Sequence, residues 1–148
     1  MTAGLVAFLR ARLDEDEQTA QAAAAGPWIR HEHVAGVHVD DGTEDRKYGT
    51  AVADCRRVRN GYGVPNALHI ARHQPARVLA GVAALRSVLD LHDHPETSDG
   101  LPDSLNRFTS AVQRQVIGDV LRHLALPYAD HPDYREEWRP GDGPVLQG

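Results

Sequence analysis

The sequence predicts an α+β protein with three longer helices, two of them an antiparallel helical hairpin, and a small antiparallel β-meander inserted after the first helix. Apolar residues recur at intervals of three and four in three stretches, as on one face of a helix. Between Trp28 and Val58 the pattern changes to alternation, which is typical of short strands. Prolines and glycines separate these stretches and mark the connections.

The first stretch predicts a helix that begins at Thr2 or Gly4 and continues to about Ala24, where Gly26-Pro27 ends it. Acidic and basic residues four positions apart on its other side are expected to pair across one turn. These pairs are Arg10 with Asp14 and Arg12 with Asp16, and the apolar stripe consists of Leu5, Phe8, Leu9 and Leu13.

Two or three short antiparallel strands are expected after this helix. Gly36 and Asp41-Gly42 mark turns between them, and Asn60-Gly61 lies in a loop from Arg59 to Pro65. We therefore expect a small meander that packs on helices.

A short helix is expected from Pro65 to His73, because Gln74 precedes a proline and is disfavoured in the α region. Pro75 suits the first position of the next helix, which continues to about His92. The apolar positions of that helix are Val78, Leu79, Val82, Leu85 and Leu89.

The last long helix follows a loop from His94 to Pro102, and Ser104 is a plausible cap for it. Pro127 ends it, and one more short helix is expected from Asp133 to Trp138. A connection of about ten residues between two helices of similar length favours an antiparallel hairpin. The apolar positions of the last long helix are Leu105, Phe108, Val112, Val116, Val120 and Leu124.

The length of 148 residues fits one globular domain over residues 1–140, followed by a disordered tail over 141–148. The net charge of −5 argues against general attraction to nucleic acid or anionic membranes, which depends on clustered positive charge. No apolar run is long enough for a transmembrane helix, and the N-terminus lacks the features of a secretory signal. The cytoplasm is the expected location.

Three segments carry a resemblance: LVAFLRARLDEDE followed by GPW, HIARHQPARVL, and LALPYADHPDYREEWRP. Together they resemble an uncharacterised family of small proteins from streptomycetes, other actinobacteria and their phages. The resemblance implies a bacterial cytoplasmic or prophage-encoded protein and no particular activity. Members often carry cysteine pairs before the last motif, but residues 89–126 contain none here. A corresponding metal site is therefore absent or rebuilt from His92, His94 and His123.

His69 and His73 form the sharpest local signal for chemistry. They lie four residues apart on one face of the expected short helix, a spacing that lets two imidazoles bind one transition metal such as zinc. His131 is the third ligand that we favour, with His92, Asp14 and Glu17 as other candidates. The alternative is structural: one histidine packs at or caps a helix end, with its second nitrogen bonded to a backbone carbonyl.

A second histidine group consists of His31, His33 and His38. Alternation places the first two on one side of a strand, close enough to share a metal. The group could equally be a set of surface residues that gain charge together near the ordinary histidine pKa of about 6.5.

Cys55 is the single cysteine, which excludes an internal disulfide. It is either a buried small side chain on a strand or a nucleophile beside Arg56 and Arg57. The basic stretch from Arg46 to Arg59 is either a solvated strand and loop or a binding patch. Too few glycines follow Asn60 for a phosphate loop, so nucleotide binding has little support.

Aromatic residues gather at the ends of the chain segments. Trp28, Tyr128, Tyr134 and Trp138 either clamp the helical core or form a partner surface. We favour the clamp, in which Tyr134 and Trp138, four residues apart on the expected terminal helix, fold back over the core. Deletion of everything after Leu126 is then expected to unfold or aggregate the protein.

These observations favour a small cytoplasmic accessory or binding protein that acts through a protein partner or by self-association, since long amphipathic helices readily present a pairing face. The alternative is a metal-binding protein or metal-dependent enzyme centred on His69 and His73. The sequence leaves open whether the protein is an enzyme. A nucleic-acid partner is unlikely on charge grounds.

Overall fold

The computed structural model describes residues 2–30, 35–40 and 49–141, and it confirms the α+β architecture. Four α-helices accompany one antiparallel sheet that follows the first helix. None of the helices in these ranges is long and apolar enough to cross a membrane. The elements are α1 (Thr2–Ala22), β1 (Trp28–Arg30), β2 (Gly36–Val39), β3 (Ala51–Asp54), α2 (Gly63–Arg72), α3 (Pro75–Asp93), α4 (Asp103–Leu124) and two 3₁₀ turns, η1 (Leu126–Tyr128) and η2 (Glu136–Trp138).

The chain divides into two compact units. One consists of Met1–Asp14 with Ala84–Gly148, and the other of Glu15–Ala83. The division falls within α1 and within α3. The expectation of one domain over residues 1–140 stays a prediction, and the expected tail at 141–148 lies outside the described residues except for Gly141.

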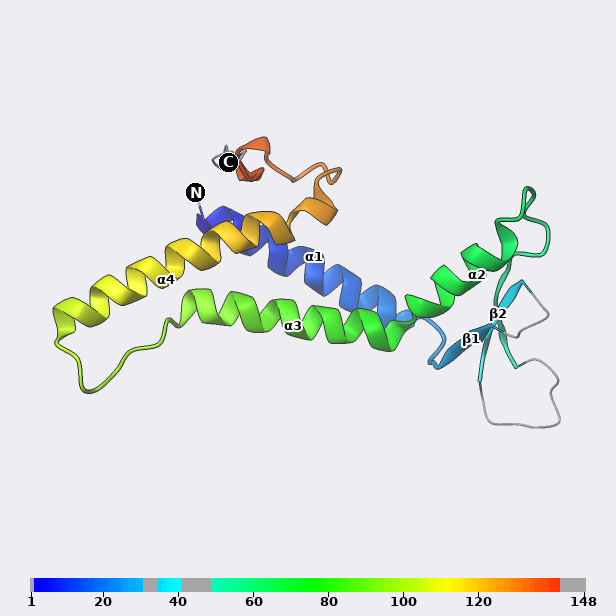
Figure 1. The fold of residues 1–148 in the computed structure, drawn as a ribbon, viewed down its shortest axis with the longest axis horizontal. Coiled ribbons are helices and arrows are strands. Elements are labelled where there is room, and N and C mark those ends of the chain that lie inside the picture. Colours follow the sequence, from blue (N-terminus) through cyan, green and yellow to red (C-terminus); the bar gives the residue numbers. More distant parts are fainter. Residues whose placement is uncertain (1, 31–34, 41–48, 142–148) are drawn as a thin grey trace, which may run out of the picture. The chain divides into compact units, whose positions relative to one another are not determined.

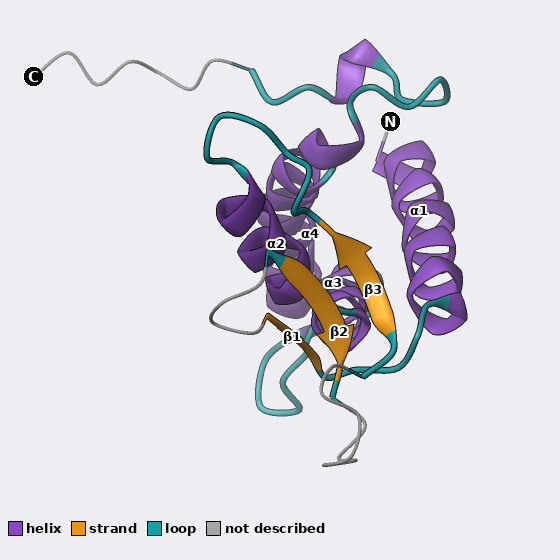
Figure 2. Ribbon diagram, turned by 90° about the vertical axis from the view of Figure 1, so that its right-hand side faces the viewer, coloured by secondary structure: helices purple, strands orange, loops and turns teal. Residues whose placement is uncertain are grey.

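The unit of Glu15–Ala83 is built on the small sheet. The strand order is β1-β2-β3, and both pairs are antiparallel, with an irregularity in register between Val37 and His38 (Figure 2). Helix α2 packs on the sheet, where Ala67 joins Val37 and Cys55 in a buried cluster. Val37 is fully buried because the pleat turns its side chain toward this helix.

A tight turn leads from the sheet into α2. Asn60 and Gly61 both have positive φ, at 62° and 78°, as expected for an Asn-Gly turn. Gly63 begins α2 two residues later, and a Cβ placed there would lie 2.6 Å from the carbonyl oxygen of Cys55. Only glycine therefore allows this close approach of helix and strand without a backbone shift.

The other unit takes its core from both ends of the chain. Helix α4 runs back in the direction opposite to residues 84–93 of α3, as expected for the helical hairpin (Figure 1). The predicted stripe of α1 is buried throughout. The buried apolar side chains of this unit are Leu5, Val6, Phe8, Leu9, Leu13, Leu89, Leu121, Ala125 and Trp138.

Two boundaries differ from the prediction. Helix α4 begins at Asp103, and its cap is Pro102 rather than Ser104, with no side-chain hydrogen bond. The carbonyl of Pro102 already accepts from the amides of Leu105 and Asn106, at 2.9 and 3.0 Å, so helical bonding starts two residues before Ser104. The expected terminal helix is only the turn η2, because Arg135 has extended backbone dihedrals.

Arg10 and Asp14 of α1 pair with residues of α3, whereas the expected pair of Arg12 with Asp16 stays a prediction. Arg10 pairs with Asp93 at 2.5 Å, and Asp14 pairs with Arg86 at 2.6 Å. The expected pairing of Arg10 with Asp14 is therefore wrong. A neighbouring helix offers each side chain an oppositely charged partner, and a single pair across one turn is worth only about 0.3–0.5 kcal/mol.

Candidate functional site

The two histidines of α2 lie together, as the spacing predicted. Their ring centroids are 4.2 Å apart, and both side chains are exposed near the end of the helix. Nδ1 of His73 lies 2.8 Å from the carbonyl oxygen of His69, which makes that nitrogen the donor of a hydrogen bond to the backbone. Nε2 of His73 then keeps its lone pair. This geometry suits a metal ligand and also matches the structural alternative of a histidine that caps a helix end.

A metal site at His69 and His73 needs at least one further ligand from the protein. Among residues 2–30, 35–40 and 49–141, no three His, Cys, Asp or Glu side chains form a group that could hold a metal ion. His131 belongs to the other unit, where the Arg12 guanidinium donates to its ring and the Asp133 amide donates to its Nδ1 at 3.1 Å. A cation against the ring weighs against a metal ion there, and the ligand role of His131 stays a prediction.

The other histidines and the acidic candidates either have contacts of their own or lie outside the described residues. His31 and His33 lie outside the described residues, and His38 is half-buried on β2. Asp14 pairs with Arg86, and Glu17 accepts a hydrogen bond from Gln21 at 3.2 Å.

His92 is half-buried and pairs with Asp93 at 3.1 Å. The His92 hydrogen bond is the largest effect that lowers the pKa of Asp93 below its ordinary value, and Arg10 adds to it. The groups at the end of α3 thus form a charged network with α1. His94 and His123 are exposed.

Cys55 is buried directly after β3, which fits a structural side chain. In the basic stretch, Arg56 pairs with Asp54 at 2.7 Å, and its hydrogen bonds hold the pKa of that carboxyl well below the ordinary range. Arg57 and Arg59 are exposed, whereas Arg46 and Lys47 lie outside the described residues. The binding patch expected as an alternative stays a prediction.

The expected clamp is confirmed for Tyr128, Tyr134 and Trp138, whereas Trp28 packs against the Val37 cluster of the other unit. Trp138 is 3% exposed, and its ring centroid lies 5.1 Å from that of Phe8 on α1. Tyr134 contacts both rings, at 5.9 Å from Phe8 and 5.8 Å from Trp138. Tyr128 meets the other edge of Phe8 at 6.3 Å. The C-terminal segment therefore completes the core over α1, although only part of it is helical.

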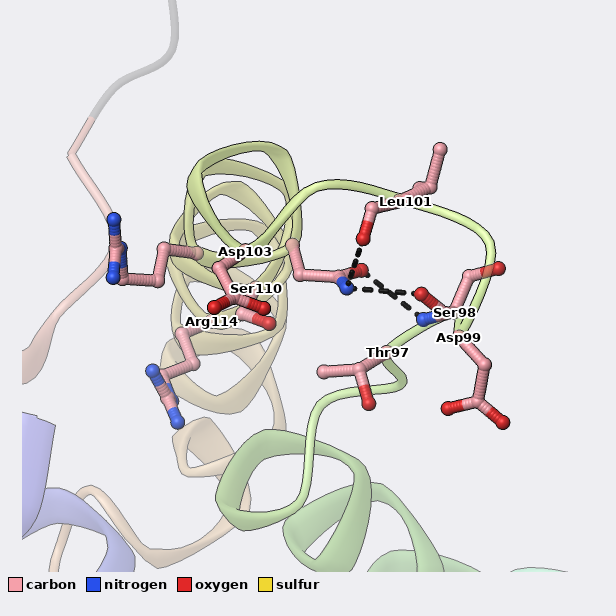
Figure 3. A pocket seen from close by; sticks show the side chains of 9 residues that line it. Thr97, Ser98, Asp99, Leu101, Asp103, Ser110 and Arg114 are labelled. Carbon is pink, nitrogen blue, oxygen red and sulfur yellow. Dashed lines mark hydrogen bonds between the residues drawn. The ribbon is translucent and has the colours of Figure 1, made fainter.

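A polar hollow of about 800 Å³ lies between the loop after α3 and the first half of α4 (Figure 3). Asn106 fixes this loop, because its amide donates to the carbonyls of Ser98 and Leu101 at 2.9 and 3.3 Å and accepts from the Ser98 amide at 3.1 Å. Asp99, Asp103 and Arg114 also line the hollow. Because acidic and basic side chains both line this open hollow, its charge favours neither an anionic nor a cationic ligand.

The most conspicuous surface feature is the apolar stripe of α4. Phe108 is 65% exposed and Val116 is 58% exposed, although both belong to the apolar face that the sequence predicted. The buried positions of this helix, Ser110, Gly118 and Leu121, lie on its other side. We call the exposed face the α4 stripe; it consists of Leu105, Phe108, Val112, Val116 and Val120.

Part of the α4 stripe is hollowed. A shallow depression of about 330 Å³ is lined by Phe108, Val112 and Val116, with Thr109, Gln113 and Ile117 beside them. The exposed side chains of α4 therefore form a ridge with a depression beside it, and the packing of two helices uses both shapes.

Sequence reasoning found the apolar residues of this stripe but not their exposure. Spacing of three and four looks the same whether the face is covered by the chain itself or by another molecule. The small side chains Ser110 and Gly118 on the packed face carry no hydrophobic signal that would have shown which side faces inward.

The comparisons with known proteins support the resemblance at the level of the family. The comparisons with curated proteins and with solved structures found no match. The model of a family of unknown function, DUF6221, matches residues 2–140, and the chain belongs to that family.

Proposed function

We propose that this protein is a small cytoplasmic accessory or binding protein that acts through the α4 stripe, which pairs with a protein partner or with another copy. The observation that carries the proposal is the exposure of five apolar side chains along one helix face. Monomeric proteins seldom leave large contiguous apolar patches in water, and such patches often mark interaction sites.

The energetics favour a covered stripe. Burial of apolar surface contributes about 25 cal/mol per Å². Phe108 leaves more of its surface in water than any other large apolar side chain of the described residues. A partner that covers Phe108 and its neighbours therefore gains free energy that the isolated chain does not obtain.

The remaining surface offers less for catalysis. Among the described residues, the contacts of the His69–His73 pair and the ion pair of His92 with Asp93 include no hydroxyl or thiol nucleophile. These observations support a binding role over a catalytic one.

Photo-cross-linking tests the proposal. A benzophenone amino acid replaces Phe108 in one variant and Ala111 in the other, because Ala111 is also exposed but lies off the stripe. Irradiation of the purified protein and of the expressing host cells is expected to give a discrete adduct from position 108, identified by mass spectrometry as the chain itself or one partner.

The Ala111 variant is the control, and it is expected to give little of that adduct. Val112→Asp in the Phe108 variant is expected to abolish the adduct, because a charge in the centre of the stripe opposes burial. Equal labelling from both positions, or no adduct from position 108 in either setting, would contradict the proposal.

A metal-binding role is the second candidate, favoured by the 4.2 Å separation of the His69 and His73 rings. Zinc or another divalent transition metal fits two neutral imidazoles. Elemental analysis of untagged protein is expected to find near-stoichiometric metal that His73→Ala removes. Metal-free protein that also fails to bind added zinc would exclude this role.

A further inference from the structure

We propose that the polar hollow between the loop after α3 and α4 binds a short peptide with free ends, with its carboxylate at Ser110 and its ammonium group at Asp103. The hollow lies on the face of α4 opposite the α4 stripe, so this ligand is separate from the partner proposed above. A polar helix face, a buried hydroxyl and an anchored loop support the site.

The face of α4 that holds its buried residues changes character along the helix. In the second half of α4, this face carries Gly118 and Leu121. At about 100° per residue, the same face carries polar side chains in the first half, and all of them line the hollow of about 800 Å³. These side chains are Asp103, Arg107, Ser110 and Arg114. Polar groups on such a face need polar partners, so this half of α4 favours a polar ligand.

Ser110 brings a buried hydroxyl to the centre of this face. The residue is only 7% exposed, yet its hydroxyl forms no hydrogen bond with the described residues. A hydroxyl inside a helix often donates to the carbonyl four residues before it, as that of Thr109 does to Leu105 at 3.1 Å. A buried hydroxyl without a partner destabilises the chain, and a ligand that bonds to it recovers that loss.

The charges of the hollow are separated along the chain. Asp99 lies in the loop, and Asp103 lies in the first turn of α4. Arg107 and Arg114 come before and after Ser110, and Figure 3 shows Arg114 and Asp99 on opposite sides of Ser110. None of these four charged side chains forms an ion pair or hydrogen bond with the described residues. Guanidinium groups bind carboxylates and carboxylates bind ammonium groups, so a ligand that carries both charges fits.

The spacing of the charges favours a peptide of about three residues over a single amino acid. Asp103 and Ser110 are about 10 Å apart along the helix axis, at about 1.5 Å per residue. Three extended residues span about 10 Å, whereas an amino acid carries both charges on one residue. The volume of about 800 Å³ also lies in the range of small-ligand sites, which is roughly 300–1,000 Å³.

Asn106 holds the loop wall of the hollow in place. Its side chain bonds to Ser98 and to Leu101, so the loop is anchored to α4 without any ligand. A wall that is already formed reduces the entropy lost when a ligand binds. The site therefore needs little rearrangement to accept a peptide.

Titration of the full chain with trialanine, followed by the NMR shifts of its amides, tests this site. Trialanine at millimolar concentration is expected to shift the amides of residues 97–114. Acetylated trialanine lacks the ammonium group, and trialanine amide lacks the carboxylate. Each blocked peptide is expected to bind at least about tenfold more weakly, because one of its two ion pairs is lost.

Variants test the assigned ends of the peptide. Ser110→Ala and Arg114→Gln are each expected to weaken trialanine binding several-fold, whereas Asp103→Asn is expected to bind trialanine no better than the acetylated peptide. Arg77→Gln is the matched control, because Arg77 is exposed but does not line the hollow, and it is expected to bind as the unmodified chain does. Circular dichroism verifies that each variant is folded.

Three results would overturn the peptide site. Trialanine could leave the amides of residues 97–114 unshifted, or the blocked peptides could shift them equally. Shifts that Ser110→Ala and Arg114→Gln leave unchanged would show that the peptide binds elsewhere on the chain. None of these results bears on the α4 stripe, which is tested separately from position 108.

Discussion

Trp138 links the C-terminal segment to the first helix. The ring lies over Phe8, and a Cβ placed at Gly4 would be 3.5 Å from its Cζ2 atom. Trp138→Ala is expected to lower the free energy of unfolding by about 3–5 kcal/mol, because it removes a buried aromatic ring and leaves a cavity. Denaturant unfolding measures the change.

Trp138→Phe is the matched control. It keeps a ring against Phe8 and removes an indole N–H that has no hydrogen-bond partner among the described residues. The loss of an unsatisfied donor offsets part of the lost area. If both variants are equally destabilised, the packing of the ring is not what stabilises this segment.

Asp93 gives stability a dependence on pH. His92 and Arg10 lower the pKa of this carboxyl in the folded state. The folded state therefore gains stability above the unfolded pKa of about 3.9, and loses it as the pH falls through the lowered folded value.

Asp93→Asn is expected to cost about 0.5–1 kcal/mol at pH 7, a modest value because Arg10 is half-exposed. Below about pH 4 the difference from the unmodified protein is expected to shrink, because Asp93 takes up a proton as the pH falls through its lowered folded pKa. Chemical denaturation at several pH values measures it. A difference that grows at low pH would contradict the assigned role.

Single residues also show the limits of sequence reasoning. The pairing of His69 with His73 could be predicted because a helix fixes residues four apart. The contact of Arg12 with His131 and the pairing of Arg10 with Asp93 join residues far apart in the chain, so their positions depend on packing that local spacing does not encode.

At the level of elements, the helix α2 depends on a glycine at its first residue. Gly63→Ala is expected to destabilise the unit of Glu15–Ala83 by about 1–3 kcal/mol, because the new Cβ would meet the backbone of Cys55 at 2.6 Å. Hydrogen exchange of the amides of β2 and α2 measures the loss locally.

Gly81 provides the opposite case within α3. No atom lies within 4 Å of a Cβ placed there, and the residue is exposed. Gly81→Ala is expected to stabilise the protein by about 0.5–1 kcal/mol, because alanine loses less backbone entropy in a helix. If the two alanine variants behave alike, steric contact at Gly63 is not the cause.

The elements themselves were largely predictable. The long helices and the Asn60-Gly61 turn follow from spacing and from the conformations that proline and glycine permit. The predicted terminal helix at 133–138 is too long, since only Glu136–Trp138 forms a helical turn. In so short a segment, the packing of Trp138 in the core outweighs helix propensity.

At the scale of the whole molecule, the α4 stripe connects fold and function. The chain buries one apolar face of α1 but leaves that of α4 exposed. The sequence predicted both faces and a pairing role for a long helix. It could not show which face stays exposed, since burial is a property of the assembled molecule.

Photo-cross-linking from position 108 tests the role of the α4 stripe as a contact surface most directly. The protein with a benzophenone amino acid at position 108 is expected to give one discrete adduct, with a partner or with another copy. The same protein with Val112→Asp is expected to keep its helical circular dichroism and to give no adduct. An adduct that persists with Val112→Asp, or no adduct from position 108 in purified protein or in host cells, would contradict the proposed function.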